Sequence, residues 1–238
     1  MKITLIGFGK MGKAIHEQAI KRGHSISMII DLDNKHELTP ENLKQTDVVI
    51  EFTTPETAFE NVTFCLQQGT PVICGSTGWL HRLEEAKSTA EVHQTGLIVA
   101  SNFSVGVNLF FELNKKLAAL MRGHTEYQPS LLEVHHTQKL DSPSGTAISL
   151  AEQILEKLPE KEKWVNHPSD VKNELVILSE RKDPAPGTHH VKYSSAIDDI
   201  EIIHTAHNRT GFALGAVLAA EFIAGKKGFY TMKEVLGI

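Results

Sequence analysis

The start of the chain constrains the fold more than any other segment. An apolar run, residues 2–6, leads directly into Gly7-Phe-Gly-Lys-Met-Gly12, and a helical pattern then extends through Arg22. In such a unit the first glycine permits a tight turn, the second lets a pyrophosphate approach the backbone, and the third lets the helix pack closely on the strand. A second apolar strand, residues 25–30, ends at Asp31, near the position of a carboxylate that binds ribose hydroxyls. We therefore predict a dinucleotide-binding βαβ unit here.

Strands and helices continue to alternate up to about residue 100. Further strands are expected at residues 47–52, 71–74 and 97–100, with a helix from Pro55 to Gln68 and another before the last strand. This order predicts a parallel sheet with right-handed crossovers, in which ligands bind outside the carboxyl ends of the strands. Two polar loops leave those ends, Phe52-Thr-Thr-Pro55 and Gly75-Ser-Thr-Gly78. Both fit ordinary strand-to-helix turns, and the second also suits a backbone that passes a flat nicotinamide ring beside Trp79.

The pattern changes after about residue 105. One apolar helix, residues 106–121, is expected to be buried on most of its surface, and strands follow near residues 126–136, 174–181, 188–195 and 199–206. Residues 159–173 carry prolines amid charges and suggest an exposed excursion, and the small-residue helix at 209–224 is expected to return to the first domain. We therefore predict an α/β chain with an N-terminal Rossmann-type parallel sheet, residues 1–103 and 207–238, plus an α+β domain with a mixed sheet, residues 104–206.

Composition excludes several classes of protein. The net charge of −5 argues against nucleic-acid binding, which needs a basic face. No apolar run is long enough to span a membrane and no signal peptide is evident, so a soluble, cytoplasmic protein is expected. Cys65 and Cys74 lack a C-x-x-C spacing and are expected to be reduced and buried.

The segment Glu133–Ala147 concentrates the chemistry. Residues 131–134 predict a strand, His135 and His136 follow at its end, and Lys139 lies in the loop beyond. Each feature alone is more often a solvated edge or loop charge. Together they set an acid, a cation and a helix start within one short segment, and so predict a site for a dianionic substrate.

A helix is expected to begin after Pro143. Ser144 is a plausible N-cap, which puts the amides of Gly145 and Thr146 in the first turn, where helices bind carboxylate or phosphate. A glycine in a helix lowers its stability by roughly 0.5 to 1 kcal/mol relative to alanine. Its presence here is understandable if a ligand approaches the backbone.

Read as a whole, this segment resembles the signature Glu-x-His-His-x-x-Lys-x-Asp-x-Pro-Ser-Gly-Thr-Ala of the 4-hydroxy-tetrahydrodipicolinate (dihydrodipicolinate) reductase family. Every fixed position matches. The resemblance also covers the Gly7 fingerprint and several later segments: Gly75–Gly78, Ala100–Asn108, Gly187–His189, His204–Arg209, Phe212-Ala213 and Met232–Leu236. It therefore extends over nearly the whole chain.

The resemblance implies an activity and a set of roles. The activity is NAD(P)H-dependent reduction of 4-hydroxy-tetrahydrodipicolinate to tetrahydrodipicolinate, in diaminopimelate and lysine biosynthesis. His135 would be the general acid and Lys139 essential for catalysis, while His136 and the amides of Gly145 and Thr146 would hold the substrate carboxylates. The residues expected to bind the cofactor are Gly7, Phe8, Gly9, Lys10, Met11, Gly12, Asp31, Gly75, Ser76, Thr77, Gly78, Asn102 and Phe103.

Assembly is also implied by the resemblance. Such enzymes are typically homotetramers in which the mixed sheets pack against one another, so residues 104–206 would serve both substrate binding and tetramerisation. A hinge is expected near residues 101–104 and 206–209.

The chemistry can be argued from the residues as well. Hydride delivered to a conjugated imine requires a proton, which a histidine can supply near neutral pH, and the substrate carboxylates need the positive partners at Lys139 and the helix start. Asp141 and Glu133 cannot face a dianion directly, so they either orient His and Lys side chains or hold the loop.

Many relatives carry a basic residue after the ribose acid, but here Leu32 follows Asp31; Lys35 could still reach a 2′-phosphate. We therefore expect NADH to be favoured, with some NADPH activity.

Two other readings stay open. A cofactor-sensing regulatory module would bind the dinucleotide without turnover. A zinc enzyme built on His135-His136 and His189-His190 is disfavoured, because adjacent histidines on a strand point to opposite faces. No metal site is predicted. The loop at residues 181–187, with two prolines, is not assigned a role.

Overall fold

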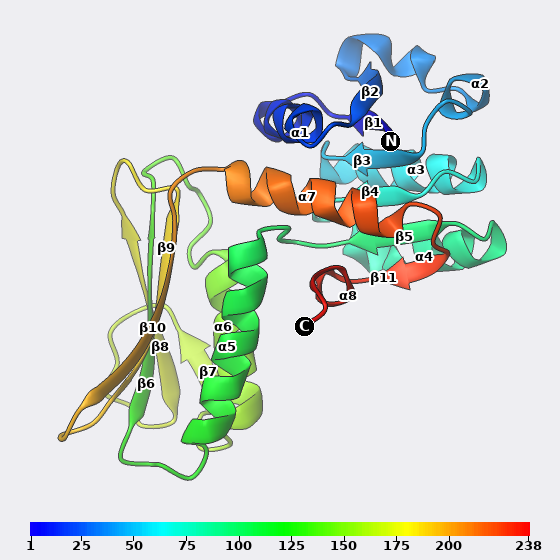
Figure 1. Cartoon of the computed structure of the whole chain (residues 1–238). Helices are drawn as coiled ribbons and strands as arrows, with labels where there is room; N and C mark the ends of the chain where they lie inside the picture. Colours follow the sequence, from blue (N-terminus) through cyan, green and yellow to red (C-terminus); the bar gives the residue numbers. More distant parts are fainter. The chain divides into compact units, whose positions relative to one another are not determined.

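The computed structural model describes the whole chain, Met1–Ile238. It divides into two compact units, one of residues Met1–Val105 with Arg209–Ile238 and the other of Gly106–Asn208. Figure 1 shows the elements of both units. No helix is long and apolar enough to cross a membrane.

The first unit is built on a parallel sheet. Its strands, in spatial order, are β11 (Gly228–Tyr230), β5 (Gly96–Val99), β4 (Val72–Cys74), β3 (Val48–Glu51), β1 (Lys2–Ile6) and β2 (Ser25–Ile30). Every pairing is parallel. The predicted Rossmann-type sheet is therefore confirmed, and β11 is an edge strand that the sequence pattern did not indicate.

Helices cover both faces of this sheet. On one face α1 (Lys10–Lys21) and α7 (Thr210–Ile223) share a core with Ile3, Leu5 and Ile50. On the other, α3 (Pro55–Gln67) and α4 (Leu83–Val92) pack on Ile6, Val49 and Leu97, because successive strand residues point to opposite faces. The remaining helical segments are η1 (Leu32–Glu37), α2 (Pro40–Leu43), η2 (Leu80–Arg82) and α8 (Met232–Leu236). The helix of small residues thus returns to the first unit.

The second unit is a mixed sheet with helices on one face. Its strands, in spatial order, are β10 (Asp199–Ala206), β9 (Gly187–Ser194), β6 (Gln128–His135), β8 (Glu174–Arg181) and β7 (Lys163–Val165). Strand β9 pairs antiparallel with β6 and β10, whereas β6 and β7 pair parallel with β8. Helices α5 (Val105–Met121) and α6 (Gly145–Lys157) contribute Phe110, Leu150 and Ile154 to one core with Leu131, Ile177 and Tyr193 of the sheet.

The opposite face of the mixed sheet carries the alternate residues of each strand. Leu178, Leu132, His190 and Ile203 lie in one row across it, since Leu132 pairs with both Leu178 and His190, and His190 pairs with Ile203. Leu178 is 40% and Ile203 is 53% exposed. This face is therefore apolar in part and uncovered within the chain.

Two expectations for the second unit are wrong. Helix α5 is not buried on most of its surface, because only one side contacts the sheet and Leu109, Leu113 and Leu120 are exposed. Residues 159–173 are not simply an exposed excursion, since they include β7 and the buried Lys161, whose ammonium donates to Gln128 Oε1 and to the carbonyls of Lys172 and Glu174. Backbone carbonyls satisfy this lysine, which a hydropathy pattern does not predict.

Candidate active site

Strand β6 carries the central residues of the site. Glu133 and His135 are two residues apart, so both side chains point to the face covered by α5 and α6. Glu133 is 0% and His135 is 7% exposed. His136 follows the last residue of the strand, and its carbonyl accepts from the amide of Lys139 in a short turn.

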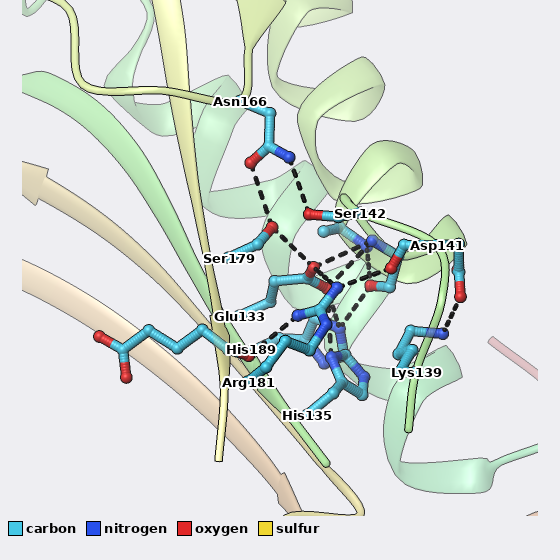
Figure 2. A network of polar contacts seen from close by, with 12 residues as sticks. Glu133, His135, Lys139, Asp141, Ser142, Asn166, Ser179, Arg181 and His189 are labelled. Carbon is cyan, nitrogen blue, oxygen red and sulfur yellow. Dashed lines mark hydrogen bonds and ion pairs between the residues drawn. The ribbon is translucent and has the colours of Figure 1, made fainter. Parts of the chain in front are cut away.

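Glu133 is the centre of a polar network (Figure 2). Its carboxylate accepts from the amide of Ser144 (3.0 and 3.1 Å), the hydroxyl of Ser179 (2.8 Å) and the guanidinium of Arg181 (3.2 Å). Burial alone would raise the pKa of Glu133, but the donor groups of His135, Ser144 and Ser179 around the carboxylate outweigh it and hold the pKa well below its usual range. Glu133 is therefore a buried, ionised carboxylate.

The ring of His135 has two different environments. Its Nδ1 lies 3.3 Å from Glu133 Oε2, within ion-pair distance, although this nitrogen is buried and out of line for a well-formed hydrogen bond. On the other side is Gly187, where an added Cβ would lie 3.1 Å from His135 Nε2. Any side chain at this position would therefore crowd Nε2, and glycine avoids that.

His189 packs edge-on against His135, with ring centroids 5.1 Å apart. Its Nε2 lies 3.2 Å from Ser144 Oγ. Burial, and then repulsion from His135, lower the pKa of His189 to about 3. His189 is therefore neutral near physiological pH.

Lys139 lies apart from this cluster, on the loop after β6 (Figure 2). Its ammonium is half-buried and forms an ion pair of 2.9 Å with Asp141 Oδ1. Burial opposes the ionisation of Asp141, but the hydrogen bond from Lys139 prevails and lowers the pKa of that carboxyl. The unassigned loop after β8 supports this region, since Asp183 accepts from the amide and hydroxyl of Thr137.

The helix start forms as the sequence predicted. Ser144 is the N-cap of α6, and its hydroxyl accepts from the amide of Ala147 at 3.2 Å. The same residue donates its own amide to Glu133, which ties the helix start to β6. A Cβ at Gly145 would meet nothing within 4 Å, so space is open beside the first turn.

Glu133, His135 and His189 also form a group whose potential ligand atoms all lie within 4.8 Å of one another. Sequence reasoning had considered the two adjacent histidine pairs, whereas the sheet brings together one histidine of each pair with Glu133. Arg181 already supplies a positive charge to the carboxylate, 3.2 Å from Oε1, and its repulsion would weaken binding of a cation there.

The first unit contains a cavity of about 460 Å³ at the carboxyl ends of β1, β2 and β3. Four of the predicted cofactor residues line it, Gly7, Phe8, Gly9 and Asp31. Gly7 has φ +94°, and a Cβ on it would lie 2.1 Å from the Phe52 carbonyl oxygen, while one on Gly12 would lie 2.2 Å from the Gly7 carbonyl oxygen. Around Gly9 the space is open. These environments match the three glycine roles of a dinucleotide fingerprint, and Lys10 and Met11 form the first turn of α1.

The other predicted cofactor residues lie outside this cavity, at the ends of β4 and β5. The Gly75–Gly78 loop packs on the Phe52–Pro55 loop, with Ser76 Oγ accepting from the Thr53 amide at 2.8 Å. Thr77 lies exposed in the same loop, and Trp79 beside it is buried in the core. Asn102 accepts from the Ser104 amide, and the Phe103 side chain is 2% exposed, packed in the core. Any contact of Phe103 with a ligand would therefore come from its backbone.

Several site residues were not found by sequence reasoning. Arg181 and His189 reach Glu133 through strand pairing, because His135 is in register with Arg181 and Glu133 with His189. In the first unit Glu51 is fully buried and accepts from the Thr53 amide and from Cys74 Sγ. Both cysteines are free and buried, as predicted. Burial, then the charge of Glu51, raise the pKa of Cys65 to about 12.

Comparison with known proteins gives a consistent result. The family models for the N-terminus and the C-terminus of dihydrodipicolinate reductase match residues 1–103 and 106–236. The 4-hydroxy-tetrahydrodipicolinate reductase of Christiangramia forsetii is 48% identical over 99% of this chain and 98% of its own length, and that of Archaeoglobus fulgidus is 32% identical over 99% and 100%. A dipicolinate-bound dihydrodipicolinate reductase from Paenisporosarcina sp. TG-14 superposes with a TM-score of 0.77 at 24% identity, covering 98% of both chains. The chain therefore belongs to the dihydrodipicolinate reductase family.

Proposed function

We propose that this protein reduces 4-hydroxy-tetrahydrodipicolinate to tetrahydrodipicolinate with a nicotinamide cofactor. The observation that carries the proposal is the arrangement of His135, Lys139 and the capped start of α6 around one loop of the second unit. Residues 104–206 would then bind the substrate, and residues 1–103 with 207–238 the cofactor. The relatives named for this reaction support the same substrate.

In this proposal His135 supplies the proton. A reduced nicotinamide, when bound, supplies a hydride to the conjugated imine. The Nε2 of His135, which faces Gly187, delivers the proton that balances the charge. His189 does not compete for this role, since burial lowers its pKa to about 3.

The carboxylates of the substrate would be held by the other groups. The Lys139 ammonium exchanges its Asp141 partner for one substrate carboxylate, and the first-turn amides at Gly145 and Thr146, with His136, bind the other. The Arg181 guanidinium and the hydrogen bonds from Ser144 and Ser179 compensate the charge of Glu133, which reduces its repulsion of the dianion.

The cavity in the first unit suits NADH better than NADPH. Asp31 Oδ1 accepts from the Leu32 amide at 2.9 Å, which fixes the carboxylate at the end of β2 where ribose hydroxyls are bound. The charged residues lining the cavity are two acids, Asp31 and Glu60, and one base, Lys35. A 2′-phosphate would be repelled by the acids and attracted by Lys35 alone, so we infer that NADH is favoured and that NADPH retains some activity.

We also propose that the protein is a homotetramer assembled through the uncovered face of the mixed sheet. The row Leu178, Leu132, His190 and Ile203 offers an apolar strip that a second copy could cover. Sedimentation at several protein concentrations tests this, and a monomer at every concentration would contradict it.

The function is tested by following NADH oxidation while dihydrodipicolinate synthase supplies the substrate. Oxidation is expected only when that substrate is present. A protein that binds NADH measurably but oxidises none in this coupled assay would instead be a cofactor-sensing module, and the proposal would fail.

A further inference from the structure

Glu133 has the position of a residue that acts through His135 rather than on the substrate. It is 0% exposed, and it lies on the Nδ1 side of the His135 ring, whereas Nε2 faces Gly187, which has no side chain to crowd it. The two nitrogens are therefore distinguished by their surroundings. In histidines generally, the hydrogen bond at one ring nitrogen decides which tautomer the other nitrogen presents.

The Nδ1 atom of His135 is buried and has no other partner than this carboxylate. A buried ring nitrogen without a hydrogen bond is costly, and a rotation of the ring that brings Nδ1 into line with Glu133 Oε2, 3.3 Å away, would satisfy it. His189 does not offer an alternative, because its Nε2 faces Ser144 Oγ at 3.2 Å.

The carboxylate is itself fixed from three directions. Ser144 at the start of α6 donates its amide to it. Ser179 on β8 and Arg181 at the end of β8 also donate to it (Figure 2). The position of the carboxylate is thereby set both by the sheet and by the start of α6, whose first turn is proposed to bind the substrate. A carboxylate held this way can fix a neighbouring ring without moving itself.

We propose that Glu133 is the positioning residue of His135: it holds the proton on Nδ1, so that Nε2 is the atom that gives up the catalytic proton. After Nε2 has released its proton to the substrate, the ring is neutral and keeps its remaining proton on Nδ1, directed at Glu133. The inference rests on the proposed function of His135 as proton donor. It goes beyond that function by naming the group that selects the reacting nitrogen.

The test is nitrogen NMR of the histidine rings, with the His135 signals assigned by their loss in His135→Gln. In the wild-type protein, neutral His135 should carry its proton on Nδ1. In Glu133→Gln the proton should shift toward Nε2, while the dissociation constant for NADH stays unchanged. Turnover should fall by about 10- to 10,000-fold, which spans the loss of a partner behind a metal-bound histidine and the loss of the acid that fixes the tautomer of a catalytic histidine.

A matched control separates positioning from simple stabilisation. Ser179→Ala removes one donor to Glu133 and leaves the carboxylate in place, so it should lower the melting temperature without changing the His135 tautomer. If Ser179→Ala alters the tautomer as much as Glu133→Gln does, the role of Glu133 is structural and the inference is overturned.

The wild-type spectrum keeps the inference testable even if Glu133→Gln does not fold, because neutral His135 with its proton on Nε2 contradicts it directly. Failure of the proposed function gives a different result, namely a wild-type protein that oxidises no NADH with substrate. If the wild-type enzyme reduces the substrate and Glu133→Gln is folded and equally active, only the inference about Glu133 is contradicted.

Discussion

Mild acid should destabilise this protein through one buried ring. His189 is 5% exposed, and its pKa is lowered from 6.5 to about 3, first by burial and then by His135. The unfolded chain therefore takes up a proton at His189 where the folded protein does not, so stability falls as the pH drops below 6.5 and goes on falling until about 3. One pH unit inside this window corresponds to about 1.4 kcal/mol. Lowering the pH from about 7.5 to about 5 should thus cost about 2 kcal/mol of unfolding free energy.

Urea unfolding at the two pH values, at one protein concentration, measures this directly. His189→Gln should lose most of the pH dependence, whatever its own stability, while a smaller part from His204, whose pKa burial also lowers, remains. Glu133 does not interfere, because a carboxyl with a lowered pKa reduces stability only once the pH falls below its ordinary range. His93→Gln is the control, since His93 is exposed at the end of α4 in the first unit. If His189→Gln keeps the full wild-type dependence, a buried neutral His189 is not the cause and the reasoning is refuted.

Substitutions at three further residues probe the sites. Asp31→Ala should weaken NADH binding by roughly 1 to 3 kcal/mol, the scale of hydrogen bonds to a charged group, and NADPH binding by less; titration of both cofactors checks this, and equal losses would show that Asp31 does not discriminate. Lys139→Ala should lower kcat and raise the substrate KM, and Lys139→Arg should restore little, because a planar guanidinium does not replace a compact ammonium; steady-state constants near wild-type would mean a solvated loop lysine. Gly187→Ala puts a Cβ 3.1 Å from His135 Nε2 and should therefore lower kcat. The loss should be smaller than about 100-fold, the cost that a misplacement of 1 Å can have. An unchanged kcat would argue that Nε2 is not the reacting atom.

The fold was predictable where local patterns decide it. The glycines after β1 and the alternation of apolar runs with helices indicated five of the strands of the first sheet. Strand β11 was not predicted, because three residues at a sheet edge are too few to give a periodic pattern. The exposure of Leu113 and Leu120 on α5 was also not predicted, since the sequence of an apolar helix does not show whether another part of the same chain covers its surface.

The site was predictable only where its residues are neighbours in sequence. His135, Lys139 and Ser144 fall within one segment, so the strand, turn and cap could be placed from their spacing. Arg181 and His189 join Glu133 because β6 lies between β8 and β9 in a particular register. That order of strands depends on long-range pairing, which periodicity along the chain does not contain.

The most direct test of the proposed chemistry is His135→Gln in the coupled assay, beside a cofactor titration and a thermal melt. If His135 is the proton donor, kcat should fall about 100- to 10,000-fold, the usual share of general acid catalysis, and the dissociation constant for NADH should stay almost unchanged. A folded variant that retains a kcat near that of the wild type would contradict the assignment.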